Sequence, residues 1–183
     1  TFFGGATINK TNYKLGGGAG EFDGVDDYVD TTDLASILSG EPLTISAWIR
    51  TPNPTQVGSI VVVSDVTENS GTVTEWVLVQ VSGEIWALSQ PTGGSGNAQA
   101  KATIPSINTW FHVVGIFNSV NSRSIYLNGQ FVQTETTSVT VNPSVRKVRF
   151  GKRGGNIQPF NGLIDEVAIF NRSLSAEEIK EIY

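Results

Sequence analysis

The chain has 183 residues, of which 39% are hydrophobic and 16% charged, with no cysteine and a formal net charge of −5. This length and hydrophobic content support a single folded domain and exclude a disordered chain, and the absence of cysteine excludes disulfides and thiol chemistry. The acidic balance disfavours a nucleic-acid partner, and no apolar run approaches the ~20 residues that a membrane-spanning helix needs, so we expect no membrane insertion.

Strand patterns dominate the first half of the chain. Residues 43–49 alternate apolar and small polar side chains, which predicts a strand with Leu43, Ile45, Ala47 and Ile49 on one face and Thr44, Ser46 and Trp48 on the other. The β-branched run at 59–64 predicts a strand that is buried on both faces. Residues 76–81 and 84–89 flank the dipeptide Ser82-Gly83, and this arrangement predicts a β-hairpin.

More strands follow in the second half. Residues 110–117 form a strongly apolar strand pattern, and residues 124–127 and 130–132 flank Asn128-Gly129, the sequence of a type I′ hairpin turn. Residues 147–151 and 163–170 are also predicted to be strands.

The strand at 147–151 lies in the one local cluster of basic residues, which comprises Arg146, Lys147, Arg149, Lys152 and Arg153. Because side chains alternate along a strand, Lys147 and Arg149 share one face while Arg146 points to the other. The cluster is therefore split between two faces, and we predict no nucleic-acid surface there.

One segment at the end of the chain is predicted to be helical. Ser175 with Glu178 three residues later forms a capping-box pattern, and residues 176–183 place Ile179 and Ile182 on one side. About twelve strands followed by one short helix indicate two packed sheets. We predict an all-β, two-sheet antiparallel jelly-roll sandwich with one short C-terminal helix.

Four motifs occur in a fixed order from about residue 20 to the end of the chain. They are FDGVDDYV at 22–29, PLTISAWI at 42–49, WFHVV at 110–114 with IYLNG at 125–129, and GLIDEVAIFNRSLS at 162–175. Together they resemble the bacterial laminin-G-like, concanavalin A-like jelly-roll domains. The resemblance implies a single domain over residues 1–183. Because the chain starts at Thr1, we expect it to be cut from a larger protein, one that is extracellular or on the cell surface.

Acidic residues gather near both ends of the chain. The first group comprises Asp23, Asp26, Asp27 and Asp30, and the second comprises Asp165 and Glu166. The first and last strands of a jelly roll are commonly neighbours, so Asp23 and Asp165 could meet around one cation with oxygen ligands. The resemblance implies the same, because family members often hold a structural calcium with these two aspartates. We predict a structural calcium bound by Asp23, Asp26 and Asp165; the alternative is that these acids only form turns.

Catalytic motifs are missing from the sequence. Retaining glycoside hydrolysis needs two carboxyl groups about 5–5.5 Å apart. Glu75 and Glu84 each lack a nearby acidic partner on the same strand face, and the adjacent Asp165 and Glu166 point to opposite faces. His112, the only histidine, lies in an apolar strand and no G-x-S-x-G motif is present, so we predict packing rather than catalysis. The sequence therefore predicts that the protein is not an enzyme.

The four tryptophans fall into two pairs. Trp48 and Trp110 lie in motifs that the resemblance places in or near the core. Trp76 and Trp86 lie in the central hairpin, a region that forms the curved, concave sheet of related sandwiches. Because an exposed indole stacks on the apolar face of a sugar, Trp76 and Trp86 are the predicted carbohydrate-binding residues. The alternative is that both indoles pack inward. Possible hydroxyl partners nearby in sequence are Glu75, Gln80, Gln90, Asn97 and Lys101.

These observations predict a non-catalytic carbohydrate-binding or adhesive module whose partner is a polysaccharide or glycan. Two alternatives stay open. One is a structural module that binds a protein partner, and the other is a glycoside hydrolase. The fold alone does not separate them, because this fold hosts all three.

Overall fold

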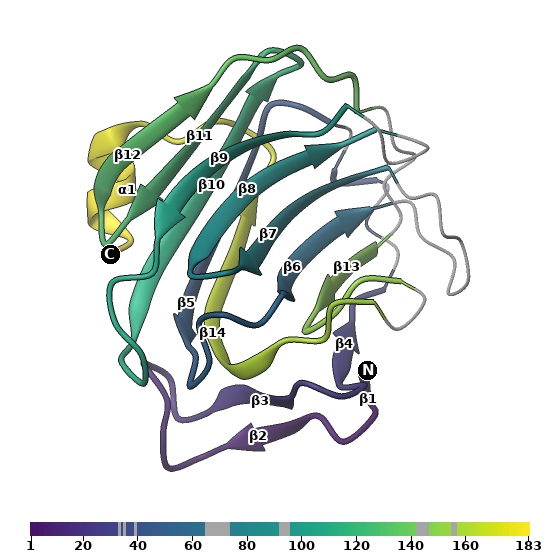
Figure 1. The fold of residues 1–183 in the computed structure, drawn as a ribbon, viewed down its shortest axis with the longest axis vertical. Coiled ribbons are helices and arrows are strands. Elements are labelled where there is room, and N and C mark those ends of the chain that lie inside the picture. Colours follow the sequence, from purple (N-terminus) through teal and green to yellow (C-terminus); the bar gives the residue numbers. More distant parts are fainter. Residues whose placement is uncertain are drawn as a thin grey trace.

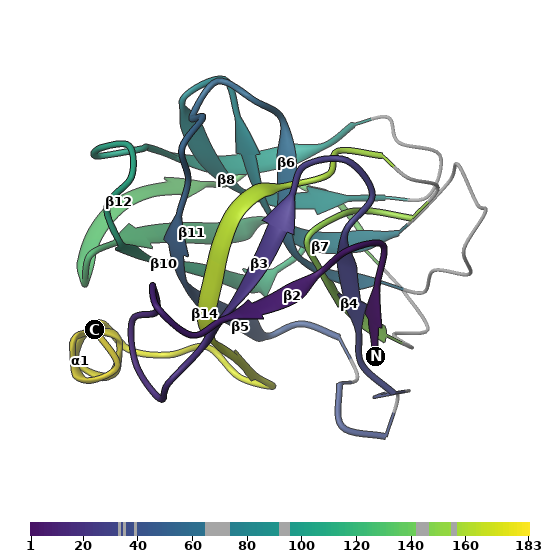
Figure 2. The same ribbon diagram turned by 90° about the horizontal axis from the view of Figure 1, so that it is seen from below.

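The structure, a computed structural model, describes residues 1–32, 34, 36–38, 40–64, 74–91, 96–141, 147–154 and 157–183. These residues form two antiparallel sheets of seven strands each, stacked as two layers, and one short helix at the C-terminus (Figures 1 and 2). The predicted all-β sandwich with a short terminal helix is confirmed. No helix among the described residues has the length and apolar character needed to cross a membrane.

Two sheets make up the sandwich, and we call them sheet A and sheet B. Sheet A contains, in order across the sheet, β1 (Phe2–Phe3), β4 (Tyr28–Asp30), β13 (Lys147–Phe150), β6 (Gly58–Ser64), β7 (Glu75–Val81), β8 (Glu84–Gln90) and β9 (Ala98–Thr103). Sheet B contains β12 (Gln130–Glu135), β11 (Ser122–Leu127), β10 (Phe111–Ser119), β5 (Leu43–Arg50), β14 (Asn161–Phe170), β3 (Ala19–Asp23) and β2 (Thr7–Asn9).

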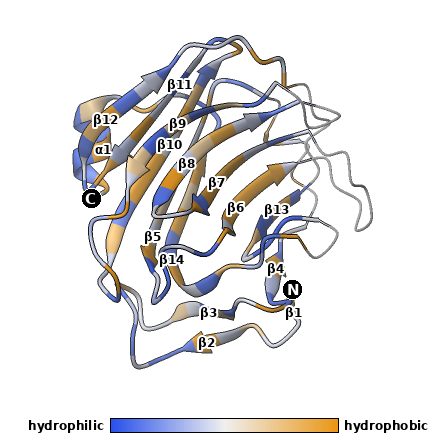
Figure 3. Ribbon diagram, in the orientation of Figure 1, coloured by the Kyte–Doolittle hydropathy of each residue, from blue (hydrophilic) through white to orange (hydrophobic). Residues whose placement is uncertain are grey.

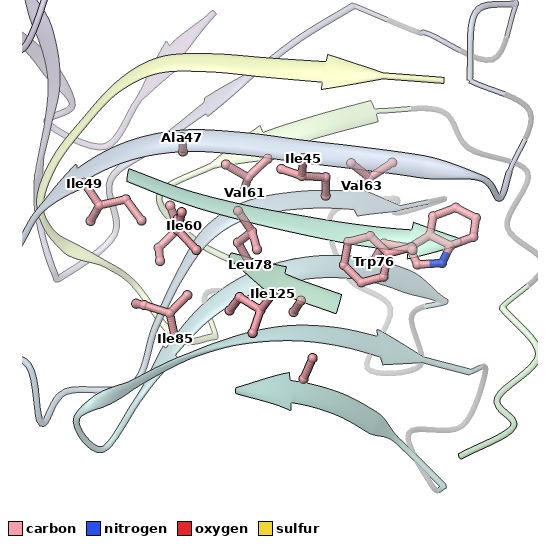
Figure 4. Packing of buried hydrophobic residues seen from close by; sticks show 14 of the residues in the cluster. Ile45, Ala47, Ile49, Ile60, Val61, Val63, Trp76, Leu78, Ile85 and Ile125 are labelled. Carbon is pink, nitrogen blue, oxygen red and sulfur yellow. The ribbon is translucent and has the colours of Figure 1, made fainter. Parts of the chain in front are cut away.

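The core lies between the sheets and takes one face from each. Along β5 the inward positions are Leu43, Ile45, Ala47 and Ile49, as the alternating pattern predicts. Sheet A contributes Val61, Val63, Trp76, Leu78, Ile85 and Ala87 to the same cluster, and Figure 4 shows several of these side chains packed together. The apolar colour in Figure 3 is concentrated on central strands such as β6 and β7. The strand β6 is buried along its whole length, as predicted.

The two sheets approach closely where β10 crosses β7 and β8. A methyl group placed on Gly115 would lie 2.8 Å from Cδ2 of Leu78 and 3.0 Å from Cβ of Ala87. These separations are shorter than ordinary carbon–carbon contact distances of ~3.5–4.0 Å. Only glycine therefore fits at this position without moving the facing sheet.

Both predicted hairpins are confirmed, with turn geometry of the expected kind. Ser82 and Gly83 have φ of 48° and 92°, and Asn128 and Gly129 have φ of 49° and 72°. Two consecutive positive φ angles define the type I′ turn, which matches the twist of the strands it joins. No strand range was predicted from the sequence for β1, β2, β3 and β4 near the N-terminus or for the edge strand β9.

The C-terminal helix α1 (Ala176–Glu181) covers part of the outer face of sheet B. Its predicted capping box is confirmed, since the Ser175 hydroxyl accepts from the Glu178 amide and the Glu178 carboxylate accepts from the Ser175 amide. Ile179 and Leu174 pack on Val114 and Ile116 of β10, in a second apolar cluster outside the main core. This cluster explains why β10 is buried on both faces over most of its length.

His112 is buried under the end of the chain, next to that cluster. The ring is 1% exposed, its Nε2 lies 2.8 Å from the Ser46 hydroxyl, and the Tyr183 ring stacks over it with centroids 5.9 Å apart. Tyr183 also stacks on Trp48, and the Lys14 ammonium lies 3.7 Å from the centroid of the Trp48 ring. The prediction that His112 is a packing residue is confirmed.

Burial, with a further contribution from the positive charge of Lys14, lowers the pKa of His112 to about 4. In the unfolded chain a histidine titrates near ~6.5. Between these two values the unfolded state binds more protons than the folded state, so the free energy of unfolding should rise with pH across this window. Denaturant unfolding followed from about pH 4 to pH 7 measures that slope. The variant His112→Asn should have a shallower slope; equal slopes in the two proteins would contradict a neutral, buried His112.

Candidate functional site

Trp86 lies on the outer face of sheet A, the face turned away from sheet B. It pairs with Val79 of β7 and Lys101 of β9 and packs on a small apolar cluster of outward side chains. The indole N–H donates to Glu84 at 2.8 Å, and the Lys101 ammonium lies 4.5 Å from the ring centroid. The ring is half-buried. Trp86 is therefore an oriented aromatic surface that retains contact with solvent.

Trp76 does not share this position, and its predicted role in binding is wrong. The side chain is 0% exposed and belongs to the main core (Figure 4), and its indole N–H donates to Glu41 at 2.9 Å. In the β7–β8 hairpin Trp76 pairs with Ser89, whereas Trp86 pairs with Val79. Because side chains alternate, these pairings place the two indoles on opposite faces of the sheet. A sugar cannot reach Trp76 in the folded domain.

The proposed hydroxyl partners also separate between the two faces. Gln80 points inward, is 1% exposed and donates to the carbonyls of Asn53 and Gln56 at 2.7 and 3.0 Å. Glu75 is fully buried on the outer face. Lys101 lies over Trp86, while the half-buried Gln90 and the exposed Asn97 lie further along the hairpin and at the start of β9. Of this group, Lys101 is the residue in contact with the Trp86 ring.

Residues from the connection between β13 and β14 cover part of the outer face of sheet A. Arg153 forms a buried ion pair with Glu75, and burial lowers the pKa of Arg153 to about 10, so the guanidinium stays charged at neutral pH. Gly154 lies beside Val62 of β6. Covered in this way, Val62 and Val77 are 1% and 0% exposed although they point outward. Trp86, two strands away from β6, lies beyond this cover and beside β9, the last strand of sheet A.

The basic residues near β13 are also paired on this face. Arg149 donates to Asp30 through Nε and Nη2, at 2.6 and 2.8 Å, and Lys147 lies 3.6 Å from the same carboxylate. Lys147 and Arg149 share one face, as predicted, whereas Arg146 lies outside the described residues. Asp30 thus offsets part of the positive charge that the sequence concentrates here.

A loop of acidic residues follows β3. Carboxylate oxygens of Asp23, Asp26 and Asp27 all lie within 4.8 Å of one another. Asp27 is 2% exposed, and its oxygens accept from the backbone amides of Gly5 and Asp23. One oxygen of Asp23 accepts from the Val25 amide at 2.7 Å. Asp23 and Asp27 therefore act as turn-forming acids, while Asp23 and Asp26 remain exposed. The three together could hold a metal ion.

Asp165 does not join this loop, so the predicted sharing of one cation by Asp23 and Asp165 is wrong. Strand pairing places Asn161 opposite Asp23, and Asp165 lies four residues further along β14, roughly 13 Å away at strand spacing. Its carboxylate accepts from the amides of Lys14 and Leu15, at 2.7 and 3.2 Å, and from Glu166 at 2.9 Å. Asp165 thus holds the β2–β3 loop against β14.

Comparisons with known proteins agree with this architecture. Solved structures with the same fold include the receptor binding domain of botulinum neurotoxin C/D mosaic serotype, at 21% identity and a TM-score of 0.75, over 100% of this chain and 45% of that chain. The botulinum neurotoxin serotype D binding domain matches at 18% identity and a TM-score of 0.72, over 100% and 45% of the two chains. The serotype G binding domain matches at 16% identity and a TM-score of 0.71, over 97% and 46%.

This chain spans less than half the length of each of those structures, and at these identities the likeness concerns the fold. No curated protein matches the sequence. Residues 23–180 match the family profile Laminin_G_3, described as the concanavalin A-like lectin/glucanases superfamily. The matched region includes the acidic loop, both hairpins and all but the last residue of the capped helix. The chain belongs to this concanavalin A-like Laminin_G_3 family.

Proposed function

We propose that this chain is a non-catalytic glycan-binding module of an extracellular or cell-surface protein, and that Trp86 is its sugar-stacking residue. The observation that carries the proposal is the half-buried indole of Trp86 on the outer face of sheet A, fixed by Glu84 at its edge and by Lys101 over its ring. A ring held in this way offers a rigid apolar surface at little cost in conformational entropy.

Polar groups around the ring suit the hydroxyls of a sugar. The Glu84 carboxylate accepts hydrogen bonds, and the Lys101 ammonium donates them. Thr103, exposed and paired with Glu84, adds a hydroxyl on the same face. Stacking on one indole with a few exposed hydrogen bonds supports dissociation constants from micromolar to millimolar, roughly −8 to −4 kcal/mol.

The arrangement of acids supports binding without hydrolysis. Glu75 and Glu84 both point to the outer face of sheet A, but Glu84 pairs with Val81, six residues from Glu75 along β7. That offset is roughly 20 Å at strand spacing. Glycosidases hold their two carboxyl groups about 5–9.5 Å apart. Glu75 is moreover buried in its ion pair with Arg153, so it does not meet a substrate.

The related structures point in the same direction. They are receptor-binding or binding domains of neurotoxins, and they share this sandwich over nearly the whole of the present chain. Attachment to a glycan on a cell surface is compatible with a receptor-binding role of the kind that those domains have. Attachment to a protein receptor is the alternative, and the exposed aromatic rings of Phe2 and Phe3 at the sheet A edge favour it.

A glycan-array screen followed by calorimetry tests the binding role of Trp86. The parent domain should bind at least one polysaccharide, and Trp86→Ala should abolish detectable binding while leaving the circular dichroism spectrum unchanged. Phe131→Ala is the matched control, because Phe131 is an exposed ring (57%) on sheet B and its loss should not affect binding. A blank screen, or full binding by a folded Trp86→Ala variant, would replace this proposal with the protein-receptor alternative.

We also propose that the acidic loop binds a structural calcium through Asp23 and Asp26, with Asp27 holding the loop in shape. Three carboxylates within 4.8 Å repel one another, and a hard cation removes that repulsion. Calcium prefers six to eight oxygen ligands, so backbone carbonyls or waters would complete the set.

Calcium should therefore raise the melting temperature relative to a chelator, in line with a stabilisation of about 2.7 kcal/mol at 100 times the dissociation constant. Asp26→Asn should remove this shift. Asp165→Asn, the matched control, should lower stability in both conditions but keep the difference between them. If calcium and chelator give the same melting temperature, the loop holds no calcium.

A further inference from the structure

The outer face of sheet B carries a polar hollow of about 150 Å³ at the end opposite to the helix-covered part. Strands β2, β3, β14 and β5 lie side by side there (Figure 1). The polar lining comes from Asn9, Glu21, Arg50, Asn108 and Asn161, and Leu163 forms the floor between two of the strands. Five separate segments of the chain thus converge on one small hollow, which is distinct from the Trp86 surface.

Two residues of opposite charge stand on either side of this hollow. Leu163 pairs with Glu21 on one side and with Arg50 on the other, so Glu21 and Arg50 are two strands apart, roughly 9–10 Å between backbones. Within the part of the chain that the structure describes, they form no ion pair with each other or with a third residue. Opposite charges this close, and held apart, are complementary to a ligand that carries both.

Arg50 is fixed in position by a loop. Its Nε donates to the Asn108 carbonyl at 2.8 Å, and the Asn108 amide donates to the Thr51 carbonyl at 2.9 Å. These bonds pin the β9–β10 connection to the end of β5 and use one nitrogen of the guanidinium. Its two terminal nitrogens stay available for an anionic group, which a guanidinium binds in a bidentate manner.

Glu21 is fixed on the other side. The Asn9 side-chain amide donates to one Glu21 oxygen at 3.1 Å. The side-chain oxygen of Asn9, Oδ1, in turn accepts from the backbone amides of Thr11 and Asn12, at 3.0 and 2.8 Å, which sets the orientation of the side chain. The second Glu21 oxygen is left to accept from a ligand donor. Both charged groups are therefore pre-positioned, so little ordering is needed on binding.

We infer that this hollow binds the ammonium and carboxylate of a free α-amino acid, the ammonium on Glu21 and the carboxylate on Arg50. The volume supports this class, because a cavity of ~150 Å³ accommodates a six-carbon ring such as benzene. The five heavy atoms of an α-amino acid zwitterion, fewer than the six of benzene, fit such a space. Asp23, which pairs with Asn161 at the rim, further disfavours a ligand with only negative charge.

An NMR titration of the labelled domain tests this inference. Glycine and alanine should shift the amide resonances of β2, β3, β5 and β14 with millimolar dissociation constants. Acetate and methylammonium, which each carry one of the two charges, should bind about tenfold more weakly or worse, as each lacks one charged hydrogen bond. Glu21→Gln and Arg50→Gln should each weaken glycine binding by a similar factor, and the spectra report directly whether these variants fold.

Trp86→Ala is the matched control, because Trp86 lies on the other sheet and its loss should leave glycine binding unchanged. This result keeps the inference independent of the glycan-binding proposal. Absence of shifts with both amino acids at tens of millimolar would overturn it. The inference would also be overturned if acetate bound as tightly as glycine and Glu21→Gln left glycine binding unchanged, because the hollow would then be a simple anion site. Shifts of the same residues by a neutral sugar alone would also overturn it.

Discussion

The structure depends on one geometric constraint, the alternation of side chains along paired strands. Each sheet must bury one complete face, and the pairing register decides which residues lie on it. In the β7–β8 hairpin the two-residue turn at Ser82-Gly83 fixes that register. It sends Trp76 into the core and Trp86 to the outer face. The candidate binding residue is therefore set by the length of one turn rather than by the type of residue alone.

The outer faces are covered unevenly, and this leaves two regions in contact with solvent. On sheet B, α1 and Tyr183 cover the part around β10, where Val114 and His112 are buried. On sheet A, Arg153 and its neighbours cover β6 and β7. Neither Trp86, beside β9, nor the hollow around Arg50 is covered by these segments. Both proposed sites thus lie on parts of the outer sheet faces that no other segment described by the structure covers.

Much of the fold could be predicted because its signals are local. Alternation along β5, the turn dipeptides and the Ser175 capping box each lie within a few residues, and all are confirmed. The strand β9 could not be predicted in this way, because it alternates alanine with polar residues and so has a weak hydrophobic pattern. The opposite orientations of Trp76 and Trp86 could have been predicted from the hairpin. A two-residue turn at 82–83 pairs residue 76 with residue 89, and residues 86 and 89 lie on opposite faces of the strand.

The sites depended on information that a sequence does not display. The prediction for Asp165 was wrong about register. The strands that carry Asp23 and Asp165 are neighbours, as expected, but Asp165 lies four residues along β14 from the position opposite Asp23. The hollow on sheet B draws Asn9, Arg50, Asn108 and Asn161 from distant segments, and none of these residues stands in a recognisable motif. Such groupings arise only once strand order and register are fixed.

The most direct test of the central claim compares the free energy of unfolding of Trp76→Ala and Trp86→Ala by urea denaturation. The account predicts a loss of about 3–5 kcal/mol for Trp76→Ala, as for other fully buried aromatic side chains, and a clearly smaller loss for the half-buried Trp86. Equal losses, or a larger loss for Trp86→Ala, would contradict the placement of Trp76 in the core and of Trp86 on the outer face of sheet A.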